Sequence, residues 1–151
     1  MEGALDKLLL KKGTMMKRQS RHASIHFVAS QLFRLGYKVD IISRDKREID
    51  LSVFDPNNPK KKVVTIKVKG LKNKTNWPLE PKLLCDTHYF ALVGYNNEFH
   101  NLSIMPEVFI IPSMEINHIL SKWSGRPEMT CINYRNIKNS NYKEAWHLLF
   151  R

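Results

Sequence analysis

The first third of the chain spaces its apolar residues as an amphipathic helix does. These residues, three or four positions apart, are Ile25, Val28, Ala29, Leu32 and Leu35. That spacing places all of them on one helical face. Ser20 is a suitable N-cap, and Gly36 can adopt the left-handed conformation that ends many helices. The sequence therefore predicts a helix over residues 20–35 with one buried side.

Strand-like alternation follows this helix. In residues 48–54 the apolar side chains fall on every second position, and residues 62–70 alternate in the same way. Residues 88–95 are nearly all apolar, which is typical of a strand buried on both faces. Two further strands are expected at residues 37–43 and 106–111.

The remaining segments complete an α/β pattern. Residues 113–123 and 141–150 are predicted as helices, the first capped by Ser113, and residues 131–134 as a short extended piece. Residues 71–84 form an irregular basic segment that contains Trp77. Three adjacent strands followed by a buried strand and more helix indicate a mixed β-sheet flanked by helices.

Length and composition predict an ordinary globular protein. At 151 residues we expect one domain over residues 20–151, preceded by a basic, flexible arm over residues 1–19. The sequence lacks a run of about 18 apolar residues and a signal-peptide pattern, so we expect no membrane association. Cys85 and Cys131 lack metal-ligand spacing, which is typical of reduced thiols in a cytoplasmic protein.

The net charge of +11 is concentrated in the first half of the chain. Residues 1–82 hold 19 Lys and Arg against 8 Asp and Glu, whereas residues 83–151 hold six of each. A polyanion is the natural partner of such a region, because neutralising phosphates releases condensed counterions. Charge alone leaves two other interpretations open, a basic surface without a partner and a basic protein-interaction domain.

Candidate chemistry lies on two of the expected strands. Asp50 is in the segment REIDLSVF, and Lys67 and Lys69 follow in TIKVKG. The strand period of two places Lys67 and Lys69 on one face. If the two strands pair, Asp50 can lie beside both lysines.

The order of these motifs resembles the PD-(D/E)XK nuclease superfamily. The resemblance covers about residues 20–113 and includes SIHFVASQLFRLGY, the Asp50 segment, TIKVKG, HYFALVGY and VFIIPS. It implies a restriction-endonuclease-like core, as in Holliday-junction resolvases, and an endonuclease that cleaves DNA with Mg²⁺ or Mn²⁺. Asp50 then matches the metal-binding Asp, and Lys69 matches the catalytic Lys.

Two positions depart from that superfamily pattern. Lys67 stands where a Glu or Gln is expected, and Ile25 stands where a helix Glu is expected. Mg²⁺ prefers oxygen ligands, so this site should bind it poorly unless other groups help. Glu48 could supply a second carboxylate, and His22 with His26, one helical turn apart, could hold a transition metal. The alternative is a catalytically inactive DNA-binding or regulatory module in which Lys67 binds phosphate.

Further basic residues flank the candidate site in the sequence, and we expect them to bind nucleic-acid phosphates rather than to read bases. They are Arg44, Lys46, Arg47, Lys60, Lys61, Lys62, Lys72 and Lys74. DNA is a better expected partner than RNA. A homodimer is also plausible, because cutting a duplex requires two sites on opposed strands.

Overall fold

The computed structural model describes residues 2–42, 48–73 and 75–150, and for residues 2 and 6–17 it describes the backbone alone. A five-stranded mixed sheet forms its centre, in the order β1-β2-β3-β5-β6. The strands are β1 (Lys38–Ile41), β2 (Leu51–Phe54), β3 (Val64–Leu71), β5 (His88–Gly94) and β6 (Glu107–Pro112). Strand β3 is parallel to β5, and the other neighbours are antiparallel.

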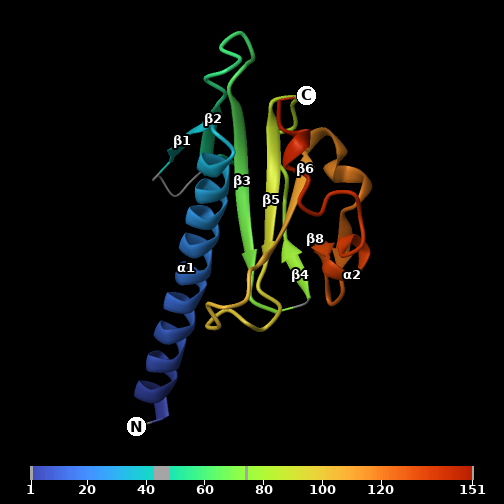
Figure 1. The fold of residues 1–151 in the computed structure, drawn as a ribbon. Coiled ribbons are helices and arrows are strands. Elements are labelled where there is room, and N and C mark those ends of the chain that lie inside the picture. The colour runs from blue at the N-terminus through green and yellow to red at the C-terminus, as the bar shows by residue number, and fades with distance from the viewer. Residues whose placement is uncertain (1, 43–47, 74, 151) are drawn as a thin grey trace.

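One helix, α1 (Glu2–Arg34), covers one face of this sheet, and its N-terminal half projects beyond the strands (Figure 1). Its apolar stripe, Ile25, Val28, Ala29 and Leu32, packs on Val64, Ile66 and Val68 of β3 and on the inner faces of β2, β5 and β6. The expected helix start at Ser20 is wrong, because α1 passes through Ser20. Residues 1–19 contain good helix formers such as Leu, Lys and Met and no proline. Their role as a separate arm stays a prediction.

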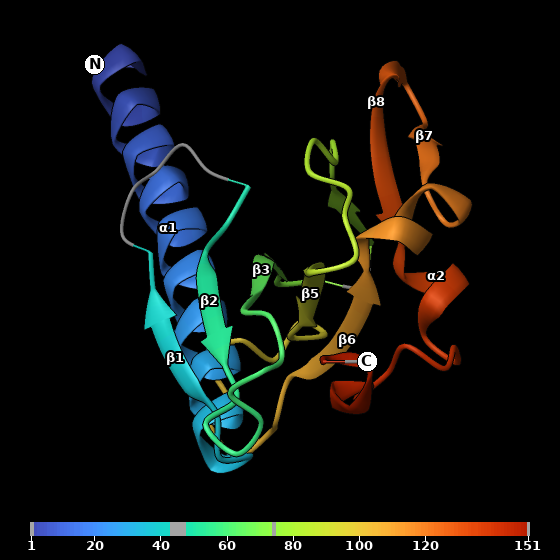
Figure 2. The same ribbon diagram turned by 90° about the horizontal axis from the view of Figure 1, so that it is seen from above.

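A smaller sheet covers part of the opposite face (Figure 2). It has the order β4-β8-β7, with β4 (Asn76–Pro78), β7 (Ser121–Trp123) and β8 (Arg126–Asn133). Trp77, fully buried, packs there with Phe90, Phe109 and Ile132. The sheet is therefore enclosed between two apolar clusters, which confirms the predicted α/β class with a mixed sheet flanked by helices.

The second half of the chain corrects three sequence predictions. The helix expected at residues 113–123 is a short 3-10 helix, η1 (Ser113–His118), followed by β7. The helix expected at residues 141–150 is only the 3-10 turn η2 (Trp146–Leu148), and a short helix α2 (Tyr134–Ile137) precedes it. The segment 71–84 contains β4, which pairs with β8. The expected piece at residues 131–134 is the end of β8.

Helix α1 packs closely against β3 at Gly70. A Cβ on Gly70 would collide with Ser24 Oγ and lie 3.0 Å from the Ser20 carbonyl oxygen. The Ser24 hydroxyl donates to that carbonyl at 2.6 Å and lies 3.1 Å from the Tyr95 hydroxyl. Gly70 thus allows the helix to rest directly on the strand beside the candidate site.

Candidate functional site

Asp50 lies directly before β2 with its carboxylate beside β3, as expected if the two strands pair. The backbone N–H of Val68 donates to Asp50 Oδ2 at 2.8 Å, and Lys67 Nζ lies 3.5 Å from the same oxygen. Asp50 is 1% exposed and Lys67 is 16% exposed. The buried carboxylate is therefore held by a backbone donor and by a lysine from the neighbouring strand.

Arg21 of α1 completes this cluster and was not among the site residues predicted from the sequence. Its Nη2 donates to Asp50 Oδ1 at 3.1 Å. Arg21 lies four residues before Ile25, the position at which the superfamily resemblance expects a glutamate. Residues four apart share a helical face, so the spacing could have indicated that Arg21 points toward Asp50. A cation thus lies on the side of Asp50 where a second carboxylate was expected.

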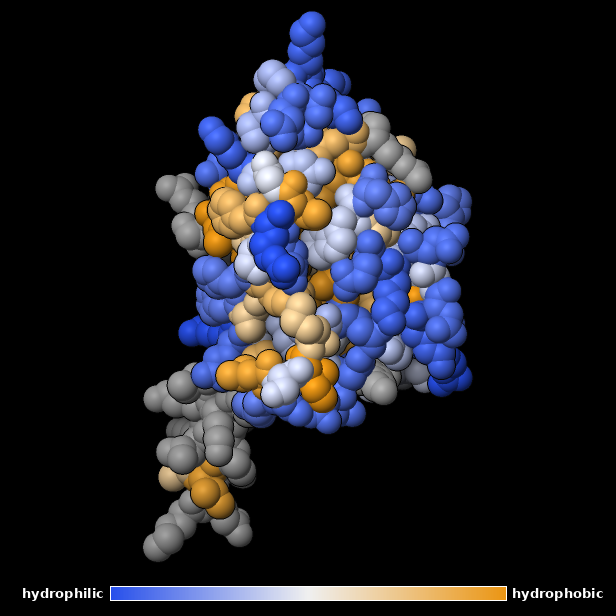
Figure 3. Space-filling view, in the orientation of Figure 1, coloured by the Kyte–Doolittle hydropathy of each residue, from blue (hydrophilic) through white to orange (hydrophobic). Residues whose placement is uncertain are grey.

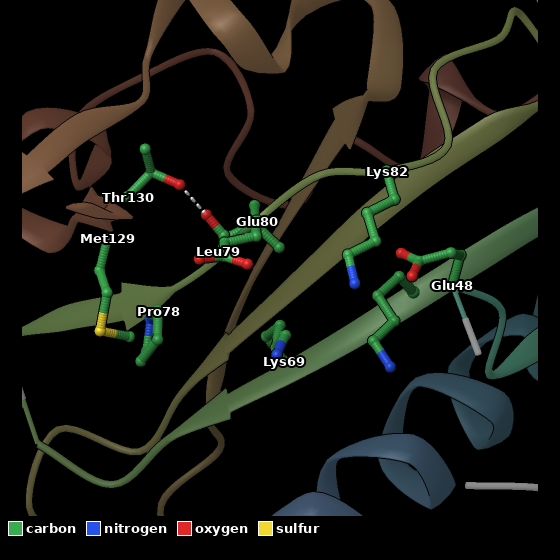
Figure 4. A pocket seen from close by; sticks show the side chains of 9 residues that line it. Glu48, Lys69, Pro78, Leu79, Glu80, Lys82, Met129 and Thr130 are labelled. Carbon is green, nitrogen blue, oxygen red and sulfur yellow. Dashed lines mark hydrogen bonds between the residues drawn. The ribbon is translucent and has the colours of Figure 1, made fainter. Parts of the chain in front are cut away.

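Lys69 lies two residues beyond Lys67 on the same face of β3, in a pocket of about 300 Å³. The pocket is formed between β3 and the smaller sheet (Figure 4). Its lining is Glu48, Lys67, Lys69, Pro78, Leu79, Glu80, Lys82, Met129 and Thr130. Pro78, Leu79, Met129 and Thr130 were not expected at the site, because local sequence patterns do not indicate that β4 and β8 pair.

Burial lowers the pKa of Lys69, and the positive charges of Lys67 and Arg21 lower it further. Asp50 and Glu48 oppose the shift without cancelling it. A buried lysine beside other cations favours its uncharged form. Lys69 therefore carries an uncharged amine more often than an exposed lysine does.

His88 lies next to these lysines at the start of β5. Its Nδ1 is 2.7 Å from the Thr65 hydroxyl, and its ring packs edge-on against Phe90. Burial, and then the charge of Lys67, lower the pKa of His88 to about 4. The imidazole is therefore neutral at physiological pH, and within the described residues its Nε2 has no hydrogen-bond partner.

The donor set around Asp50 does not fit a magnesium ion. Both oxygens of Asp50 already contact Arg21, Lys67 or the Val68 N–H. Across the described ranges, no three His, Cys, Asp or Glu side chains are grouped as metal ligands would be. At about 5 Å and an effective dielectric of about 20, each lysine would repel a divalent ion by about 7 kcal/mol before screening. Glu48 lines the pocket, and metal binding by Asp50 and Glu48 stays a prediction. His22 and His26 are exposed on α1.

Among the flanking basic residues that the structure describes, Lys60, Lys61 and Lys62 lie far from Lys72. Lys60, Lys61 and Lys62 lie in the turn before β3, whereas Lys72 follows its end, about 23 Å away by strand rise. Lys61 Nζ donates to the Phe150 carbonyl oxygen at 2.8 Å, and Lys72 Nζ lies 4.8 Å from the centre of the Phe99 ring. The other predicted contacts lie outside the described residues: Arg44, Lys46, Arg47 and Lys74.

The surface is mostly hydrophilic on the face seen in Figure 3, with apolar residues in smaller groups. None of the helices in the described part of the chain is both long and apolar enough to cross a bilayer.

Comparison with known proteins shows a fold similar to that of one homing endonuclease. No protein-family model and no curated protein matches this chain. Among solved structures, the bacterial homing endonuclease I-Ssp6803I is similar, with 14% sequence identity and a TM-score of 0.52. The match covers 87% of this chain and 88% of that protein. At this identity the likeness shows the arrangement of helices and strands alone.

Proposed function

We propose that this chain binds DNA through the lysine-bearing face of β3 and that its nuclease-like site binds phosphate in place of a metal. The observation that carries the proposal is the ion-paired state of Asp50. Arg21 and Lys67 neutralise this carboxylate on opposite oxygens, so it is poorly suited to a divalent cation. Lys67 and Lys69 line the adjacent pocket and present positive charge there.

Charge distribution and fold support the same partner. The whole positive excess of the chain lies in residues 1–82, which contain α1, β2 and β3. Lysine contacts to phosphates supply affinity without sequence preference and weaken as salt rises. I-Ssp6803I is a homing endonuclease, and a similar fold in this chain supports DNA as the partner over RNA.

A specific observation favours a second candidate, a PD-(D/E)XK-type endonuclease. Glu48 and Lys69 line one pocket, and Asp50 lies beside it in contact with Val68 of the same strand. In the superfamily resemblance, Asp50 is a metal ligand and Lys69 is the catalytic lysine. Glu48 would have to act as a second ligand, and Lys67 would have to leave the metal position. Double-strand cutting would further need two copies of the chain.

Plasmid nicking and gel retardation, run in parallel, separate the two candidates. We expect salt-sensitive retardation in EDTA and no nicking with Mg²⁺ or Mn²⁺, for the wild type and for Asp50→Ala alike. Metal-dependent nicking that disappears in Asp50→Ala would establish the endonuclease instead. A protein that neither retards nor nicks DNA would contradict both candidates and support a basic protein-interaction domain.

A further inference from the structure

The Lys69 pocket combines an amine, carboxylates and apolar walls in a small volume. Figure 4 shows Lys69 between Pro78 and Met129 on one side and Glu48 and Lys82 on the other. The apolar walls come from β4 and β8, and the charged residues come from β3 and the segments next to β2 and β4. This arrangement places a partly desolvated amine beside carboxylates that can move protons.

Such an amine is suited to attack a carbonyl carbon. Lysines that form imines in enzymes are activated by desolvation or by a neighbouring cation. Lys69 has both, because the pocket walls bury it and Lys67 lies two residues away on the same face. Its reactivity requires no metal ion, in keeping with the ion-paired state of Asp50.

DNA offers an aldehyde to such an amine at an abasic site. A deoxyribose that has lost its base opens to a C1′ aldehyde, whereas an intact nucleotide has no such group on its sugar. The pocket, at about 300 Å³, lies at the lower end of the range of about 300–1,000 Å³ for small-molecule sites. It can therefore accept a baseless sugar with its phosphate more readily than a nucleotide with its base.

We propose that Lys69 forms an imine with the C1′ aldehyde of an abasic site and that the pocket then cleaves the DNA strand by β-elimination. This proposal rests on the proposed DNA-binding function and names a substrate class for the same pocket. Lys69 would be the nucleophile and Glu48 the base. Lys67 and Lys82 would hold the flanking phosphates.

The steps balance without an oxidant or reductant. The uncharged Nζ of Lys69 adds to C1′, and the aldehyde oxygen takes up a proton from solvent and leaves as water, which gives a protonated imine. Glu48 removes a proton from C2′, the C2′–C3′ double bond forms, and the C3′–O bond breaks. The electron pair of that bond leaves with the oxygen of the 3′ phosphate. Water then hydrolyses the imine and releases an unsaturated aldehyde, and Glu48 returns its proton to solvent.

Borohydride trapping tests the imine directly. A labelled duplex with a single abasic site is incubated with the full chain in EDTA and reduced with sodium borohydride, and adducts are resolved on a denaturing gel. We expect a covalent adduct whose peptide map locates the modification on Lys69. Lys69→Arg keeps the charge and should reduce the adduct by at least about tenfold, because a guanidinium is not a nucleophile. Lys138→Arg, an exposed lysine outside the pocket, should leave it unchanged.

Gel retardation of the same duplex separates failure of this proposal from failure of DNA binding. Retardation without an adduct would overturn the imine and leave the proposed function standing. Absence of both would overturn both. An adduct that maps to another amine, or one that persists in a Lys69→Arg protein with an unchanged unfolding temperature, would overturn the assignment to Lys69.

Discussion

The two faces of β3 share one backbone and carry opposite chemistry. On the face toward α1, Val64, Ile66 and Val68 are all buried in the main apolar cluster. On the opposite face, Lys67 and Lys69 line a pocket with other charged residues. Side-by-side lysines repel each other and do little for stability, whereas each buried aliphatic side chain stabilises the fold by about 1.5–3 kcal/mol. The face toward α1, here the inner face, thus accounts for the stability of the fold. The lysines on the opposite, outer face are better explained by a bound ligand.

The largest expected contrast between the faces is in stability. Ile66→Ala removes a side chain with no exposed surface and should lower the free energy of unfolding by about 2–5 kcal/mol. Lys69→Ala on the outer face should change it by less than about 1 kcal/mol. Urea unfolding of both variants measures the difference. Equal losses would mean that the outer face also holds the fold together.

A larger side chain at Gly70 on the inner face should also destabilise the fold. A Cβ there collides with Ser24 Oγ, so Gly70→Ala should destabilise the protein by about 1–3 kcal/mol. Adding Ser24→Ala removes the colliding oxygen and should recover part of this loss. A double-mutant cycle by urea unfolding measures the coupling. Additive effects would show that α1 does not rest on β3 at this point.

Asp50 links the two faces, because its carboxylate forms ion pairs with Arg21 of α1 and with Lys67 on the outer face of β3. Asp50→Asn retains an acceptor for the Val68 N–H but removes the charge that both cations contact. We expect a loss of about 1–2 kcal/mol, since both cations are partly exposed and screened. DNA affinity should rise, because the outer face becomes more positive. A fall in affinity would contradict the phosphate-binding role.

His88 adds a pH dependence on the outer side of the sheet. Its pKa is about 4 in the folded protein against an ordinary value of 6.5, so its contribution to stability is complete above pH 6.5. That contribution is lost as pH falls from 6.5 toward 4, because the unfolded chain binds the proton more readily. His88→Gln should flatten this part of the stability profile. Unfolding temperatures measured across the range test it against the wild type.

The sequence predicts one region of this protein better than the other. The alternation in β3 follows from strand periodicity, whereas the pairing of β2 with β3, which brings Asp50 beside Lys67, was only a condition of the sequence prediction. The contact of Arg21 with the site could have been predicted from helical spacing, which places Arg21 on the same helical face as Ile25. The predicted helices at residues 113–123 and 141–150 were wrong because apolar residues at helical spacing, such as Ile116 and Trp123, also fit a 3-10 helix and a short strand.

The far wall of the pocket could not be predicted in the same way. Met129 and Thr130 reach Lys69 only because β8 pairs with β4 across more than 50 positions of sequence. Local patterns carry no information on such a pairing. Trp77 is fully buried, and its indole N–H donates to the Val93 carbonyl oxygen at 3.2 Å.

The salt dependence of DNA binding, measured in EDTA, tests the central claim most directly. Fluorescence anisotropy with a labelled duplex gives the slope of log affinity against log salt for the wild type, Lys67→Gln/Lys69→Gln and Lys138→Gln. We expect tight binding without metal, and a slope reduced by about one to two in the double variant, because Lys67 supplies a full phosphate contact and Lys69, whose pKa is lowered, supplies a partial one. Lys138→Gln should match the wild type. Binding that requires a divalent metal, or an unchanged slope in the double variant, would contradict the assignment of this face to phosphate.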